Sequence, residues 1–187
     1  MAEFSIEEKK ELLALARQTV RNFLEEKRKE YPENTRPHFT EKRGVFVTLH
    51  RRGELRGCIG YPLPIKPLHQ AVVDNAIAAA FEDPRFPPVR MPELDEIDFE
   101  ISVLTVPRQI DHPDQVQIGQ DGIIVSKGFR RGLLLPQVPV EQGWDLSHYL
   151  AYGCLKAGLA EDEWRRGVTI ETFQAIVFGE KELEKMG

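Results

Sequence analysis

Cys58 is the residue of this sequence whose type and neighbours best fit catalytic chemistry. It directly follows Arg56 and Gly57, and Gly60 comes two positions later. A thiolate is the reactive form of cysteine, and a guanidinium or the N–H groups of a glycine-rich turn favour it over the thiol. The pattern predicts either a nucleophilic or redox thiol, or a small residue that fills a half-buried site. Ligation of a metal ion stays open as a third role.

A reactive thiol also needs a base or an acid within hydrogen-bonding reach. His50 shares the predicted face of Cys58, but four residue pairs along a hairpin separate the two, which is roughly 13 Å. Glu100 and Ser102 lie on the polar side of a later predicted strand. They approach Cys58 only if that strand pairs beside the strand of Cys58. The sequence by itself therefore supplies no partner for the thiol.

The segment DPRF, which begins at Asp83, offers a further pair of charged groups. Asp83 and Arg85 can form an ion pair that caps the loop, or they can bind a carboxylate or a phosphate. The glycines that flank Cys58 permit a close approach either by a ligand or by a neighbouring helix. The candidate site is therefore Cys58 as the catalytic residue and a cleft formed by Arg56, Gly57, Gly60, Asp83, Arg85, Glu100 and Ser102.

A β-hairpin over residues 45–60 is predicted to position Cys58. Apolar and polar residues alternate along it, and this alternation selects the register. A three-residue loop, Arg51 to Gly53, pairs Leu49 with Leu55 and collects the apolar residues on one face. Cys58 then points away from that face, on the same side as Arg56.

Helices and a strand are predicted on either side of this hairpin. A capping box at Ser5 begins a helix that is expected to end near Glu30. Pro67 suits the first turn of a second helix, which ends by Asp83 because a proline follows. Alternating apolar residues then predict a half-buried strand over residues 98–105.

The same order of elements recurs in the second half of the chain. Residues 122–135 are predicted to form a second hairpin. Asp145 is expected to cap a helix, with the Trp144 side chain packing on Tyr149 as a hydrophobic staple. One strand is predicted over 168–178. An Arg-Gly pair opens the second strand of both hairpins, with an offset of 132 − 57 = 75 positions.

These recurring elements predict an internal duplication, with approximate repeats over residues 44–106 and 119–178 of a single domain, 1–187. The connection lengths and the alternation favour antiparallel pairing. We therefore expect an α+β fold in which two unequal subdomains share an antiparallel sheet behind an N-terminal helix. Leu133 occupies the position of Cys58 in the second repeat, so the hairpin itself does not require a cysteine.

Composition narrows the class of protein. The chain has 187 residues, 41% of them apolar and 29% charged, which is typical of a globular protein. A net charge of −5 argues against general nucleic-acid binding. No apolar run approaches the ~18 residues of a membrane span, and the start of the chain has no secretory apolar core, so we expect a cytoplasmic protein.

Cysteine and histidine spacing predicts no metal and no cofactor. The two cysteines are 154 − 58 = 96 positions apart, and the five histidines do not cluster at ligand spacing. A metal site assembled from distant parts of the chain stays open.

Six segments, in order, carry a resemblance to a known family. They are LRGCIG (55–60), DPRF (83–86), ISVLT (101–105), LLLPQV (133–138), EQGWD (141–145) and CLKAG (154–158). The chain resembles, over about residues 8–178, the AMME chromosomal region protein family, whose prokaryotic members are called AmmeMemoRadiSam system protein A. The resemblance implies an α+β fold with two unequal subdomains. It also implies an association with a Memo-like protein, expected here as a separate chain, and with a radical S-adenosylmethionine enzyme.

Three functions are therefore carried forward. The first is an accessory or substrate-presenting protein, which works with a Memo-like protein and a radical S-adenosylmethionine enzyme in a modification pathway. The second is an enzyme that uses Cys58 as a nucleophile or a redox thiol. The third is a nucleic-acid-associated module, which the acidic net charge disfavours.

Overall fold

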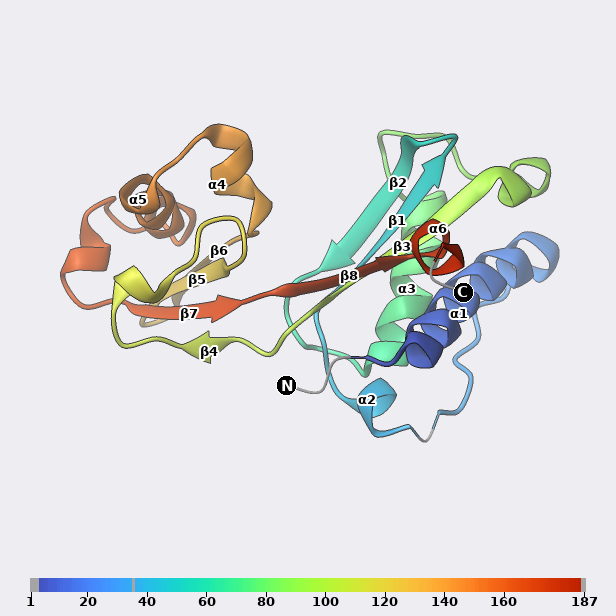
Figure 1. Ribbon diagram of the computed structural model, residues 1–187, viewed down its shortest axis with the longest axis horizontal. Coiled ribbons are helices and arrows are strands. Elements are labelled where there is room, and N and C mark those ends of the chain that lie inside the picture. The colour runs from blue at the N-terminus through green and yellow to red at the C-terminus, as the bar shows by residue number, and fades with distance from the viewer. Residues whose placement is uncertain (1–3, 35, 186–187) are drawn as a thin grey trace. The chain divides into compact units, whose positions relative to one another are not determined.

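The computed structural model describes residues 4–34 and 36–185. The chain folds into two compact units, unit 1 up to Leu104 and from Ile176 onward, and unit 2 over Thr105–Ala175. Each unit combines helices with a four-stranded sheet (Figure 1). The predicted α+β class is confirmed, but the strands form two sheets where the sequence predicted one shared sheet. No helix among the described residues has the length and apolar character that a membrane crossing requires.

Unit 1 is built on a sheet with the strand order β2-β1-β3-β8. Its elements in chain order are α1 (Ile6–Glu26), α2 (Pro37–Thr40), β1 (Val45–Arg51), β2 (Glu54–Tyr61), α3 (Leu68–Phe81), the 3-10 helix η1 (Met91–Glu96), β3 (Ile97–Leu104), β8 (Ala175–Gly179) and α6 (Glu180–Glu184). β1 pairs antiparallel with both β2 and β3.

One face of this sheet is apolar and forms the core of unit 1. Val45, Val47 and Leu49 of β1, together with Phe99 and Ile101 of β3, are fully buried. α3 packs against β1 and β2, and α1 packs against α3 and β3. The alternate residues belong to the opposite face, which we call the polar face; among them Thr48, His50, Cys58, Asp98 and Glu100 are half-buried.

Unit 2 is built on a sheet with the strand order β4-β7-β5-β6. Its elements are β4 (Arg108–Gln109), the 3-10 helix η2 (Pro113–Gln115), β5 (Gly122–Lys127), β6 (Arg130–Leu134), α4 (Gln137–Gln142), α5 (Leu146–Lys156), the 3-10 helix η3 (Glu163–Arg165) and β7 (Thr169–Phe173). α5 packs on β5 and β6. Its fully buried Tyr149 donates a hydrogen bond from the hydroxyl to the backbone oxygen of Asp121, at 3.0 Å.

Several local predictions are confirmed, and others need correction. The capping box at Ser5 is present, but α1 ends at Glu26 because Lys27 adopts a left-handed conformation, with φ of 55°. Asp145 caps α5 as predicted. The predicted staple of Trp144 onto Tyr149 stays a prediction: Trp144 packs against the buried cluster that contains Tyr149. The Trp144 ring also stacks on Tyr152, with centroids 4.0 Å apart.

The single strand predicted over 168–178 is divided between the two units. Its first part, β7, pairs with β5 in unit 2, and its second part, β8, lies next to β3 in unit 1. The break falls at Gln174, whose backbone N–H donates to Thr105 Oγ1 at 2.9 Å and whose carbonyl accepts from Thr105 N–H at 2.8 Å. The predicted second repeat, 119–178, therefore runs three residues into unit 1.

The internal duplication stays a prediction. In both units a hairpin, a helix, a 3-10 helix and a further strand follow in that order, and the first hairpin strand lies in the middle. The offset is not constant, however. Leu49 and Val125 are the corresponding residues of the two first hairpin strands. Leu49 pairs with Phe99 in unit 1 and Val125 pairs with Ile170 in unit 2, so the third strands are offset by 170 − 99 = 71 positions rather than 75.

Candidate functional site on the polar face of unit 1

The turn between β1 and β2 sets the position of Cys58. Arg52 and Gly53 both have positive φ, 54° and 87°, which is the two-residue type I′ turn rather than the predicted three-residue loop. Arg51 pairs with Glu54 and His50 with Leu55, and the register then shifts between Leu49 and His50. The extra residue of this β-bulge is Arg56. The predicted register is therefore wrong, and Leu55 is exposed instead of lying on the buried face.

Cys58 lies opposite Thr48 as a result of this register. The Thr48 hydroxyl donates a hydrogen bond to Cys58 Sγ over 3.3 Å. The backbone N–H and carbonyl of Cys58 both bond outward, away from β1, so this is a pair whose side chains approach closely. The prediction that Cys58 points away from the apolar face agrees with this placement.

The ion pair of Asp83 and Arg85 covers the outer edge of β2 at Cys58. Asp83 Oδ2 accepts from the Cys58 N–H at 2.9 Å, and Arg85 Nη2 donates to the Cys58 carbonyl at 3.3 Å. The two side chains also bond to each other, with Nη2 and Oδ2 2.7 Å apart. The pair thus occupies the two main-chain groups to which a neighbouring strand would bond. Of the two sequence interpretations, the structure shows the loop-stabilising ion pair.

Asp83 is ionised under almost all conditions because of these bonds. Its side chain is only 2% exposed. The hydrogen bonds from the Arg85 guanidinium, against the opposing effect of burial, hold the pKa of the Asp83 carboxyl well below its usual range, with help from the Cys58 N–H. The Asp83 carboxylate, and to a smaller extent the Cys58 thiolate, raise the pKa of Arg85. The Arg85 guanidinium thus lies beside the backbone of Cys58.

The sequence suggested that Arg56 favours the thiolate of Cys58, but in the structure its guanidinium bonds to Glu93 instead. Arg56 is buried, and its Nε and Nη2 donate to the two carboxylate oxygens of Glu93 on η1, at 3.1 and 2.8 Å. Glu93 also caps η1 by accepting from the Arg90 N–H. Arg56 therefore fastens η1 to the hairpin. A strict two-residue alternation of apolar and polar residues does not predict the bulge that turns Arg56 toward Glu93.

Glu100 and Ser102 are not beside Cys58, because β3 pairs with β1 and not with β2. Glu100 lies opposite Thr48, and Ser102 lies opposite Phe46. Cys58, Thr48 and Glu100 form one row across three strands, so Glu100 is two strand spacings, or about 10 Å, from Cys58. The structure thus places Glu100 on the face of Cys58 but beyond hydrogen-bonding distance.

His50 is nearer to Cys58 than the sequence predicted. It is two residues from Thr48 on β1, so it is a diagonal neighbour of Cys58, and such neighbours are about 7–8 Å apart. His50 pairs with Asp98 and lies in a groove of about 420 Å³ beside Glu100. The groove is lined by His50, Gly53, Asp98, Phe99, Glu100, Gly179, Glu180, Lys181, Glu182 and Lys185. Sequence reasoning missed this groove because its residues come from three distant segments.

The two glycines around Cys58 make room for the protein's own backbone. A Cβ atom on Gly57 would lie 2.2 Å from the carbonyl oxygen of Ala79 in α3. A Cβ on Gly60 would lie 2.3 Å from the carbonyl oxygen of Val45. Between the two interpretations of these glycines, these distances favour close packing of the fold over the approach of a ligand. Within residues 4–34 and 36–185, no three histidine, cysteine or carboxylate side chains are grouped as a metal site would need.

Comparison with known proteins places this fold in a family. The AMMECR1 family model matches residues 13–178. The chain belongs to the AMMECR1 family. Protein MK0488 of Methanopyrus kandleri is 50% identical, with 96% of this chain and 92% of that protein covered. Protein MJ0810 of Methanocaldococcus jannaschii is 51% identical, with 89% and 87% covered.

A solved AMMECR1-like structure has the same fold. The crystal structure of an uncharacterized protein, PH0010 from Pyrococcus horikoshii, superposes with a TM-score of 0.70 at 46% identity, and covers 90% of this chain and 89% of its own. The resemblance inferred from six short segments is therefore confirmed.

Proposed function

We propose that the protein is an accessory protein that binds its substrate or partner through the polar face of unit 1. One observation carries this proposal. The charged groups around Cys58 are committed to structural bonds, Asp83 and Arg85 to the edge of β2 and Arg56 to Glu93. A catalytic acid or base must be free to exchange a proton with the substrate. These groups hold the strand in place instead.

The groove on the polar face supplies binding chemistry. The described ion pairs include one between Lys181 and Asp98 but none that involves Glu100. The Glu100 carboxylate can therefore accept hydrogen bonds from a cationic or amide group, while His50 offers a ring nitrogen beside it. A groove of about 420 Å³ suits a side chain or a small polar group rather than a large cofactor.

The partners follow from the genomic association of the family. We propose that the chain presents a substrate group to a Memo-like protein and a radical S-adenosylmethionine enzyme from the same organism, in the cytoplasm. The chain would then show little activity alone. Its contribution would be the orientation of the group to be modified.

Titration calorimetry of the chain against each purified partner tests the proposal. We expect saturable binding to at least one of them, and Glu100→Gln and His50→Ala should each weaken it about tenfold, because each removes a polar contact worth about 1.4 kcal/mol. Glu25→Gln, an exposed change on α1, is the matched control and should bind like the wild type. Absence of binding to both partners, or equal binding by all variants, would contradict the proposal.

Thiol chemistry at Cys58 is the second candidate, because the Arg85 guanidinium bonds to the Cys58 carbonyl and His50 is a diagonal neighbour of Cys58. Cys58 is half-buried, whereas Cys154 is fully buried and its burial raises the pKa of that thiol. We expect iodoacetamide to label Cys58 in the native protein and Cys154 only after unfolding. Mass spectrometry of the labelled peptides measures both.

The same labelling separates the two candidates. If Cys58 works as a thiolate, Arg85→Ala should slow its native labelling at pH 7 by about threefold or more, since the cation that favours the thiolate is lost. An unchanged rate in Arg85→Ala would leave Cys58 as a packed side chain and would remove the thiol candidate. Cys154→Ser provides the background in which only one cysteine reacts.

A further inference from the structure

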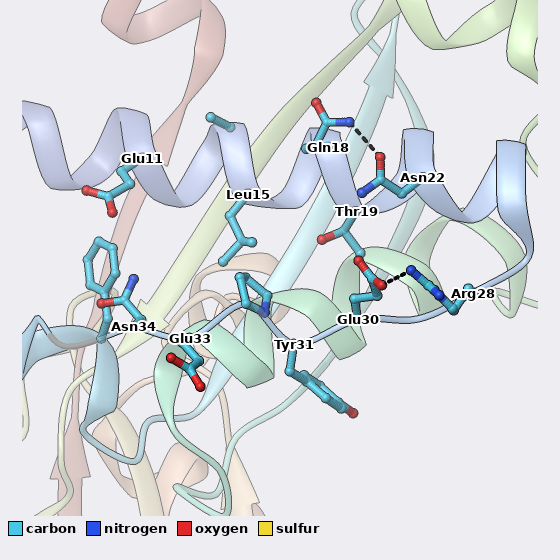
Figure 2. A pocket seen from close by; sticks show the side chains of 13 residues that line it. Glu11, Leu15, Gln18, Thr19, Asn22, Arg28, Glu30, Tyr31, Glu33 and Asn34 are labelled. Atoms are coloured by element: carbon cyan, nitrogen blue, oxygen red, sulfur yellow. Dashed lines mark hydrogen bonds and ion pairs between the residues drawn. The ribbon is translucent and has the colours of Figure 1, made fainter.

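A second groove runs along the outward side of α1, well separated in sequence from the polar face. It has a volume of about 930 Å³, and Figure 2 shows α1 on one side of it and the segment 28–34 on the other. It is lined by Glu11, Ala14, Leu15, Gln18, Thr19, Asn22, Arg28, Glu30, Tyr31, Pro32, Glu33, Asn34 and Phe39. None of these residues takes part in the site proposed above.

The segment 28–34 is bonded to α3, and the residue Arg36 just beyond it is bonded to α1. Asp74 of α3 accepts a hydrogen bond from the Tyr31 hydroxyl at 2.6 Å and forms ion pairs with Lys29 and Lys66. Just beyond the segment, Arg36 Nε donates to Glu11 of α1 at 3.0 Å. These bonds position the segment that forms one wall of the groove.

The main chain of this segment offers hydrogen bonds. Among the described residues, no backbone–backbone hydrogen bond involves residues 28–34. An extended peptide laid against such a segment can pair with its carbonyl groups and with the N–H groups of every residue but Pro32, as in the addition of a strand to a sheet edge. α1 cannot do this, because its own backbone groups are used within the helix.

The side chains of the groove combine a mostly apolar floor with one carboxylate, that of Glu33, which lies outside the described ion pairs. Leu15, Thr19 and Phe39 lie at its base, and Thr19 and Phe39 are buried. Of the charged side chains that line it, Glu11 forms an ion pair with Arg36, and Glu30 forms one with Arg28. Glu33 is exposed, and the described ion pairs do not include it. The groove is thus complementary to a ligand with apolar and cationic groups.

Its length fits a short peptide. The lining residues of α1 run from Glu11 to Asn22, and eleven helical steps of about 1.5 Å give about 17 Å. An extended peptide advances about 3.3 Å per residue, so about five residues span the groove. Alternation along an extended chain lets apolar side chains face the floor while a basic side chain on the other side faces Glu33.

We propose that this groove binds an extended, basic segment of a partner protein, about five residues long, which pairs with the backbone of residues 28–34. Apolar residues of the segment cover Leu15 and Thr19, and a lysine or arginine meets Glu33. The site is independent of the polar face, so it holds whether or not the proposed function does.

Fluorescence anisotropy with the labelled peptide acetyl-KVKVK-amide tests this assignment on the full chain. We expect saturable binding at low salt that Ala14→Trp weakens at least tenfold, because the exposed Ala14 lines the groove and an indole there fills it. Ala160→Trp, at an exposed alanine of unit 2, is the matched control. Glu33→Lys should weaken binding at least threefold, whereas Glu25→Lys on the same unit should leave it unchanged.

Three results would overturn the proposal. The first is no saturable binding of the basic peptide by a chain whose circular dichroism shows it to be folded. The second is equal binding of acetyl-EVEVE-amide, which would remove the charge complementarity. The third is displacement of the peptide by equimolar spermidine, which would show that the groove recognises a small cation instead of a backbone.

Discussion

Gly57→Ala is expected to lower the free energy of unfolding by about 3 kcal/mol or more. The new Cβ would lie 2.2 Å from the carbonyl oxygen of Ala79, and this neighbour belongs to the backbone of α3. A backbone atom in the last turn of a buried helix cannot rotate away as a side chain can, so α3 must shift against the sheet. Urea unfolding followed by tryptophan fluorescence and circular dichroism measures the loss.

Gly179→Ala is the matched control for this change. A Cβ there meets its nearest atom at 3.5 Å, and the backbone φ is −132°, so alanine fits without strain. We expect a change within about 0.5 kcal/mol. Gly132→Ala should behave like Gly57→Ala, since its Cβ would lie 2.3 Å from the backbone nitrogen of Ala157. Equal stability of the Gly57 and Gly179 variants would show that α3 does not press on β2 in this way.

Asp83→Ala is expected to cost about 2 kcal/mol and to expose the edge of β2. The buried carboxylate accepts from the Cys58 N–H and from both the backbone and the guanidinium of Arg85. Hydrogen bonds to an ionised group contribute about 1.5–3 kcal/mol, and part is recovered because the Cys58 N–H and Arg85 become hydrated. Hydrogen exchange of the Cys58 amide should accelerate more than that of other β2 amides. An unchanged exchange rate would contradict the role of Asp83 as an edge cap.

The stabilisation by Asp83 should depend on pH in one direction. Because the folded-state pKa of this carboxyl is depressed, its contribution is fully present above the unfolded value of about 3.9 and is lost as the pH falls toward the folded value. The difference in stability between the wild type and Asp83→Asn should therefore shrink from pH 5 to pH 2.5. Asp111→Asn, an exposed change in unit 2, serves as the control. A difference that grows on acidification would contradict the assignment.

Local signals in the sequence predicted much of the secondary structure. The Ser5 capping box, the end of α3 before Pro84 and the alternation in β3 each depend on residues within one or two turns. The register of the first hairpin was missed for a physical reason. It requires Arg52, a residue with a side chain, in the left-handed conformation that sequence patterns assign to glycine.

The candidate site was predicted less well because its bonds join distant segments. Arg56 was placed beside the thiol, but its partner Glu93 is 37 positions away. The association of Asp83 with the Cys58 backbone spans 25 positions, and only the short step from Asp83 to Arg85 could be seen in the sequence. Similarly, the segment 168–178 contains no glycine or proline. Nothing local therefore marks Gln174 as the point where the chain leaves one sheet for the other.

The division of that strand has a consequence for biosynthesis. Unit 2 is one uninterrupted stretch of chain, whereas the sheet of unit 1 takes its fourth strand from beyond it. Arg17 of α1 bonds to Glu180 with Nη2 and Oε2 2.6 Å apart, across 163 positions. Loop closure over that separation slows the last step of unit 1, and this step cannot occur until residues 175–180 have been synthesised. Unit 2 can form first on the nascent chain, and unit 1 then waits with an open sheet edge for its final strand.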